Sequence, residues 1–165
     1  MGYYVHITDA DWYIPTDKQD AAYKAVCALN ERNDLKRGGI SPRPEGLEQT
    51  TGANNYLWFS WMDAYYPETC PTLRAVLEQV GFDLYEDEDE SLVISGYNSK
   101  SGQEDLFLWT IAPFAVAVRS EFPFVDWRGE EGEQWRNVVY EQRLYNQRIA
   151  MVPSGDPSLY EPSRW

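Results

Sequence analysis

The clearest periodic pattern in this chain is a short amphipathic helix, and it constrains the structure around it. Its apolar side chains recur at i, i+3, i+4 and i+7, as Leu73, Val76, Leu77 and Val80. Gly81 follows at the expected left-handed position that ends such a helix. Because a helix with one apolar stripe must bury it against another layer, we expect a layered fold.

The rest of the chain alternates between strand-like and helix-like segments. Residues 82–85 and 92–97 predict a hairpin whose turn holds the acidic residues between them. Other strands are expected at 3–8, 56–62, 121–128, 134–140 and 144–152, and other helices at 17–33 and from Ser101 onward. The order predicts an α+β fold, with about three helices packed on one face of a mixed, mostly antiparallel sheet and a C-terminal β-meander.

Local signals predict where several of these elements begin and end. Thr16 is the expected N-cap of the first helix, and Ser101 with Glu104 predicts a capping box for the last one. Pro113 should end or kink that last helix. The strand over 56–62 has aromatic side chains on both faces, which is typical of a central strand.

A length of 165 residues indicates one domain, which we expect to span 1–152. Residues 153–165 are rich in proline and predict a flexible tail. Residues 35–55 have no periodicity and predict a long loop. No signal peptide or membrane span is recognisable, so a cytoplasmic protein is expected.

The charge balance is strongly acidic, with 27 Asp and Glu against 14 Lys and Arg and a net charge of -13. Six of the eight residues from Asp83 to Glu90 are carboxylates. Such a surface repels nucleic acid and anionic membranes and attracts basic proteins, including those that bind nucleic acid. We therefore expect a basic protein surface as partner, with no direct binding of nucleic acid or membrane.

The acidic residues of two predicted turns are the candidate partner-binding residues. The first group is Glu86, Asp87, Glu88, Asp89 and Glu90, and the second, around the turn at 129–132, is Glu130, Glu131 and Glu133. The simplest interpretation of the first group is a solvated turn. The functional interpretation is a mobile, strongly negative finger that steers a basic protein.

Aromatic residues support an alternative, a cleft for a small ligand near Trp58 and Trp61. Sheet aromatics usually pack in a core, but they also line clefts for sugars or stacked bases. Trp127 and Trp135 flank the turn at 129–132 and are expected to face each other across the hairpin.

No catalytic, metal or cofactor motif is recognisable, so the sequence predicts no catalytic residue, no metal and no cofactor. His6, Asp9 and Asp11 have the spacing of a weak metal cluster, but one histidine is too few for a typical zinc site. Along a strand, His6 should also face away from Asp9 and Asp11. Whether the chain is an enzyme stays open.

Four segments together resemble small uncharacterised proteins of actinobacteria and actinobacteriophages. They are residues 2–7 (GYYVHI), 58–62 (WFSWM), 96–104 (GYNSKSGQE) and 129–136 (GEEGEQWR). The resemblance implies a phage or actinobacterial context and assigns no chemical role to any residue. Many small acidic phage proteins bind and inhibit host proteins, which agrees with the charge argument.

The leading hypothesis is therefore a small acidic protein-binding module, of the kind a phage encodes to inhibit or modulate a host or defence protein. The alternative is a small-ligand-binding or enzymatic domain with the aromatic cleft near Trp58 and Trp61. A structural or self-assembling protein is a third possibility, and the sequence leaves the oligomeric state open.

Overall fold

The computed structural model describes residues 2–39, 57–149 and 157–162. The predicted loop over 35–55 lies outside the described residues from residue 40 onward. The helices are α1 (Thr16–Leu29), α2 (Tyr66–Thr69), α3 (Leu73–Val80) and α4 (Glu104–Ile111), with single 3₁₀ turns at η1 (Asn33–Leu35) and η2 (Ala112–Phe114). The strands are β1 (Tyr4–Asp11), β2 (Tyr13–Ile14), β3 (Gly38–Gly39), β4 (Leu57–Trp58), β5 (Phe82–Glu86), β6 (Leu92–Lys100), β7 (Phe124–Gly129), β8 (Gln134–Tyr140), β9 (Arg143–Ile149) and β10 (Ser158–Leu159).

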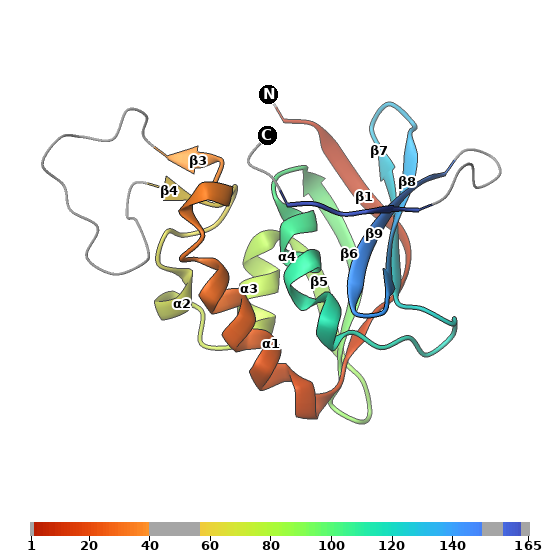
Figure 1. The fold of residues 1–165 in the computed structure, drawn as a ribbon, viewed down its shortest axis with the longest axis horizontal. Coiled ribbons are helices and arrows are strands. Elements are labelled where there is room, and N and C mark those ends of the chain that lie inside the picture. The colour runs from red at the N-terminus through yellow and green to blue at the C-terminus, as the bar shows by residue number, and fades with distance from the viewer. Residues whose placement is uncertain (1, 40–56, 150–156, 163–165) are drawn as a thin grey trace, which may run out of the picture.

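Eight strands form one sheet in the order β10-β9-β8-β7-β1-β6-β2, with β5 also paired to β6. Every strand pair among the described residues is antiparallel. Strands β7 to β10 are neighbours both in the chain and in the sheet, so they form a C-terminal meander (Figure 1). The predicted α+β domain with a mostly antiparallel sheet and a C-terminal meander is confirmed.

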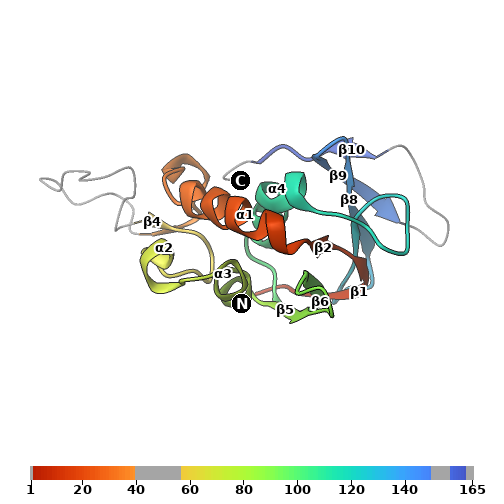
Figure 2. The same ribbon diagram turned by 90° about the horizontal axis from the view of Figure 1, so that it is seen from below.

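Helices α1, α3 and α4 cover the sheet, which curves around α4 (Figure 2). The predicted stripe of α3 is buried, and Gly81 ends that helix with a φ of 125°. The core between the helices and the sheet includes Trp12 and Trp127, which have no more than 1% of their surface exposed. No helix in the described part of the chain is long and apolar enough to cross a membrane.

The aromatic segment over 56–62 is not a central strand, and that prediction is wrong. Only Leu57–Trp58 is extended, and it pairs with β3 in a separate two-stranded sheet. Trp61 has a φ of 71°, which breaks the strand, while Phe59 and Met62 turn into the core. Phe59 and Met62 are three residues apart, and the bend at Trp61 lets both reach the core without a strand.

A buried glutamine holds this bent segment against the start of α4. The side-chain oxygen of Gln103 accepts hydrogen bonds from the backbone N–H groups of Arg37 and Ser60, at 3.1 and 3.2 Å. Its amide nitrogen donates to the carbonyl oxygen of Leu35 at 2.6 Å. Since these three bonds join distant parts of the chain, no local pattern predicts them.

Two predicted N-caps differ from the structure. Pro15 precedes α1, so Thr16 is its first helical residue and makes no cap. Glu104 begins α4 after Gln103, and its carboxylate accepts hydrogen bonds from the Ser101 hydroxyl at 2.8 Å and from the backbone N–H of Gly102 at 2.6 Å. The predicted pair is therefore in contact, but Ser101 lies two residues before the N-cap, Gln103, and caps no N–H group of the helix. The predicted end at Pro113 is confirmed, because α4 gives way to η2 there.

The C-terminal part of the sheet shows two features that the sequence did not predict. The β8–β9 turn places Glu141 and Gln142 at φ values of 48° and 64°, although neither is a residue that favours such a turn. Within the predicted tail, Ser158–Leu159 forms β10 on β9, and Tyr160 packs against the core. Ser158–Leu159 thus forms the edge strand of the sheet.

Candidate functional site

The acidic residues between β5 and β6 form a tight turn with its own internal cap. One carboxylate oxygen of Asp87, Oδ1, accepts hydrogen bonds from the backbone N–H groups of Asp89 at 3.0 Å and Ser91 at 2.9 Å. Glu90 has a φ of 61°. Asp87 is half-buried and has a structural task, whereas Glu86, Glu88, Asp89 and Glu90 are exposed.

The same turn is bound to the first turn of α1. The Thr16 hydroxyl donates to the carbonyl oxygen of Asp89 at 2.8 Å, and the Gln19 amide donates to that of Glu90 at 2.9 Å. Figure 1 shows the β5–β6 turn beside the start of α1 at one end of the molecule. The acidic turn between β5 and β6 is therefore hydrogen-bonded to α1 through its own backbone carbonyl groups.

These contacts gather exposed carboxylates at that end of the molecule. We call them the acidic end: Asp17, Glu86, Glu88, Asp89 and Glu90. Within the described chain, a cation approaches only one of them, since Arg74 Nη1 lies 4.0 Å from Glu86 Oε1. The other carboxylates face water without an ion pair, so they keep their full attraction for a basic partner.

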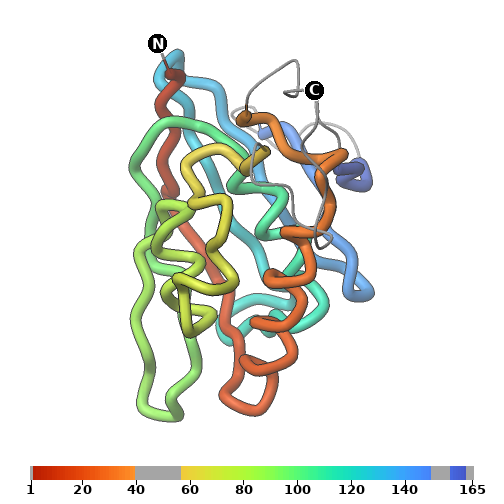
Figure 3. The backbone as a smooth tube through the Cα atoms, turned by 90° about the vertical axis from the view of Figure 1, so that its left-hand side faces the viewer, coloured from red at the N-terminus to blue at the C-terminus, as the bar shows by residue number. Residues whose placement is uncertain are grey.

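The second predicted group, Glu130, Glu131 and Glu133, lies at the opposite end of the sheet. Its turn joins β7 to β8 and lies near the N-terminal end of β1, where the Glu130 N–H donates to the carbonyl oxygen of Tyr4 at 3.0 Å. Figure 3 shows this turn at the top of the molecule and the β5–β6 turn at the bottom. The two groups therefore form separate surfaces.

The two tryptophans of the predicted cleft pack against glycines. A Cβ atom at Gly38 would come within 2.2 Å of the Trp58 ring, and one at Gly102 within 2.3 Å of Trp61 Nε1. Trp58 is half-buried and Trp61 is exposed. Neither ring lines the cavities described below.

Asp11, which the sequence suggested only as part of a weak metal cluster, anchors the loop at residues 118–120. It is fully buried and accepts hydrogen bonds from the N–H groups of Val118, Arg119 and Ser120 and from the Ser120 hydroxyl, at 2.6–2.9 Å. Burial alone would raise the pKa of Asp11, but these bonds outweigh it and lower that pKa. Asp11 therefore stays ionised in the interior.

Asp9 and Asp11 both contact Arg119, but they differ in burial, since Asp9 is exposed and Asp11 is buried. The register shift in the pairing of β1 with β7 lies between Ile7 and Asp9, so both carboxylates follow it in regular pairing. Asp9 forms an ion pair with Arg119 at 2.9 Å. No group of three or more His, Cys, Asp or Glu side chains in the described ranges is placed to hold a metal ion.

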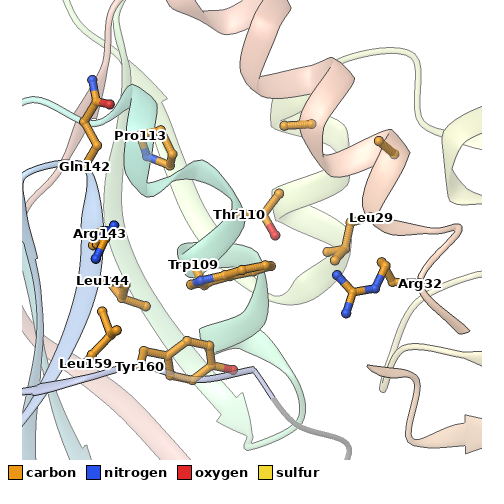
Figure 4. A pocket seen from close by; sticks show the side chains of 12 residues that line it. Leu29, Arg32, Trp109, Thr110, Pro113, Gln142, Arg143, Leu144, Leu159 and Tyr160 are labelled. Atoms are coloured by element: carbon orange, nitrogen blue, oxygen red, sulfur yellow. The ribbon is translucent and has the colours of Figure 1, made fainter. Parts of the chain in front are cut away.

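A groove of about 580 Å³ lies between α1, α4 and the start of β9. Trp109 lies at its centre, with Leu144 and Tyr160 on the sheet side (Figure 4). Arg143 lies on that side and Arg32 on the α1 side, where Asp34 holds it through two hydrogen bonds of 3.0 and 2.8 Å. The groove is thus apolar in its floor and basic at its margins.

Asp105, in the first turn of α4, has an unusual carboxyl group that sequence reasoning missed. Burial and the neighbouring charge of Glu104 raise the pKa of Asp105 to about 6, while the Tyr160 hydroxyl and the charge of Arg37 favour its ionised form. The sequence does not distinguish Asp105 from the other acidic residues, because its pKa depends on the residues that surround it in the folded structure.

Comparisons with protein-family models, with curated proteins and with solved structures gave no match.

Proposed function

We propose that this chain is a small acidic protein-binding module that occupies a basic surface of its partner. One observation supports this most: exposed carboxylates of the acidic end stand on a backbone that is hydrogen-bonded to α1. Carboxylates held in place lose less freedom on binding than those of a free loop. The net charge of -13 adds long-range attraction.

The biological setting is part of the proposal. The resemblance to small proteins of actinobacteria and their phages supports an inhibitor or modulator of a host or defence protein, and nucleic-acid-binding host proteins present the basic surfaces required. The second group, Glu130, Glu131 and Glu133, remains a separate candidate surface, since it cannot engage the same patch as the acidic end.

The alternative, a ligand-binding or enzymatic domain with a cleft at Trp58 and Trp61, has weaker support. Both rings are packed on glycines, and neither lines the groove at Trp109 or the cavity at Trp135. The polar cavity beside Trp135 is a better-supported ligand site in this fold.

The test compares two neutralised variants of the whole protein. The first is Glu86→Gln/Glu88→Gln/Asp89→Asn/Glu90→Gln, which leaves Asp87 in place, and the matched control is Glu130→Gln/Glu131→Gln/Glu133→Gln at the other end. Immobilised wild type captures partners from an actinobacterial lysate, and association rates are then measured with the purified partner at several salt concentrations. We expect the first variant to associate more slowly by on the order of tenfold at low salt and the control to be unchanged.

Two results would contradict the proposal. Equal association rates for wild type and the first variant would show that the acidic end does not contribute to binding. A slower association of the control variant alone would show that the partner binds the β7–β8 turn.

A further inference from the structure

A polar cavity of about 300 Å³ lies where the first turn of α4 meets β8, β9 and β10. Its lining includes Asp105, Trp135, Asn137, Asn146, Arg148 and Ser158. All of these but Trp135 are polar or charged, so the cavity differs from the apolar groove beside it. Its volume is at the lower end of the range for small-molecule sites, which suits a single ring.

A chain of hydrogen bonds determines which group Asn146 can offer to a ligand. The indole nitrogen of Trp127 donates to Asn137 Oδ1 at 2.7 Å, and an indole N–H can only donate. The amide of Asn137 therefore directs its nitrogen to Asn146, and that nitrogen donates to Asn146 Oδ1. The remaining polar group of Asn146 is its NH₂, for which the described residues supply no acceptor.

The other polar groups complement this donor. The Ser158 hydroxyl donates to the backbone carbonyl of Asn146 at 3.2 Å, so its oxygen is left to accept. Asp105 supplies a carboxyl group that accepts hydrogen bonds at neutral pH, and its raised pKa of about 6 lets it donate one only at lower pH. Arg148 is exposed and supplies further donors. The cavity thus offers both donors and acceptors, as sugar hydroxyls require.

Trp135 gives the cavity its apolar wall. Its ring stacks on Trp127 with centroids 6.1 Å apart and an angle of 8° between the planes, as expected for facing residues of the hairpin. The buried ring of Trp127 holds Trp135 in position, so the wall is preformed. An apolar face of a sugar ring packs well on such a surface.

We propose that this cavity binds one neutral sugar ring, either free or at the end of a glycan. The acidic surface of the protein disfavours an anionic ligand. No second aromatic ring faces Trp135 across the cavity to enclose a nucleobase, among the residues described as lining it. The donor and acceptor set and the single aromatic wall therefore favour a sugar over a nucleoside.

The experiment titrates the full-length protein with D-glucose, D-galactose, D-mannose and N-acetyl-D-glucosamine, and separately with adenosine and uridine. Proton–nitrogen NMR spectra report on the Asn146 side-chain NH₂ and the Trp135 indole N–H. We expect at least one sugar to shift both signals and to saturate with a dissociation constant on the order of 1 mM.

Three variants of β9 separate the site from its surroundings. Asn146→Asp keeps the inner hydrogen bond from Asn137 and replaces the outward NH₂ by an acceptor, and Arg148→Ala removes the exposed donors. We expect each to weaken sugar binding by about tenfold or more, as loss of one well-made polar contact does. Arg143→Ala, on the same strand but in the apolar groove, is the control and should bind as wild type does.

Three outcomes would overturn the proposal. These are no shift of the two signals with any sugar, shifts with the nucleosides alone, or equal weakening by Arg143→Ala. Spectra of each free variant establish that it is folded, so a loss of binding is not a loss of structure.

Discussion

The end of β1 and the start of α4 each hold a desolvated carboxylate, one fully buried and one half-buried, and the two groups behave in opposite ways. Asp11 accepts four hydrogen bonds from one loop, and its pKa is lowered. Asp105 lies beside another acid, Glu104, with less compensation, and its pKa is raised to about 6. Burial acts on both, so the number of donors around each carboxylate makes the difference.

The comparison separates a structural acid from one that is available for chemistry or binding. Asp11 is fully occupied by the loop that it anchors, while Asp105 lines a cavity. The acidic end is a third case, in which the carboxylates stay in water. A count of acids in the sequence does not distinguish these roles, and substitutions do.

The largest effect is expected for Asp11→Asn. The amide places an NH₂ group against N–H donors, so unfolding should become easier by about 2–4 kcal/mol. Because the folded pKa of Asp11 is lowered, its contribution is present above its unfolded pKa of about 3.9 and is lost as the pH falls through the folded value. Urea unfolding of both proteins at pH 7 measures the difference.

Asp9→Asn is the control for Asp11→Asn, since it removes only an exposed ion pair with Arg119 and should cost at most about 1 kcal/mol. If both substitutions destabilised the protein equally, Asp11 would not be the anchor of the loop at 118–120.

The next effect has the opposite sign. Asp105→Asn should stabilise the protein at pH 7.5 by about 1–3 kcal/mol, since it removes a carboxylate that is ionised in an unfavourable setting. The folded state holds this proton more tightly, so wild-type stability falls as the pH rises from about 4 to about 6. The gain of the variant should therefore disappear below about pH 4, as measured by unfolding across this range. If the gain in stability were the same at every pH, it would not arise from the ionisation of Asp105, and the prediction would be wrong.

A smaller effect is expected within the acidic turn for Asp87→Ala. It removes the acceptor for the N–H groups of Asp89 and Ser91 and should destabilise the protein by about 1 kcal/mol. Glu88→Ala, at an exposed neighbouring position, is the matched control and should leave the melting temperature nearly unchanged. Equal melting temperatures for the two variants would show that Asp87 does not support the turn.

The smallest effect is expected for Glu88→Gln/Asp89→Asn. Both side chains are exposed, so removing their mutual repulsion should leave stability unchanged or raise it by less than about 0.5 kcal/mol. Any gain should shrink in high salt, because screening weakens the repulsion. A clear loss of stability in a thermal melt would show that these acids make native contacts.

Much of the fold could be predicted from the sequence because local patterns carry it. The apolar stripe of α3 and Gly81 after it were sufficient to predict that helix. The two strand-like segments on either side of the acidic residues were sufficient to predict the β5–β6 hairpin. The bent segment at Trp61 and β10 could not be predicted, since contacts far along the chain hold them. The β8–β9 turn could not be predicted for a local reason, because Glu141 and Gln142 are not residues that favour a positive φ. Gln103, which joins three such segments, has no local signature.

The sequence by itself determined the α+β class, the acidic balance and the two acidic turns, because composition and short-range periodicity depend only on neighbours in the chain. Only the tertiary structure decided that those turns lie at opposite ends and that one of them is bound to α1. It also decided which carboxyl groups have a shifted pKa. Asp11 and Asp105 are the same kind of residue, but folding surrounds Asp11 with hydrogen-bond donors, which lower its pKa. Asp105 is desolvated beside Glu104 with fewer donors, so its pKa is raised.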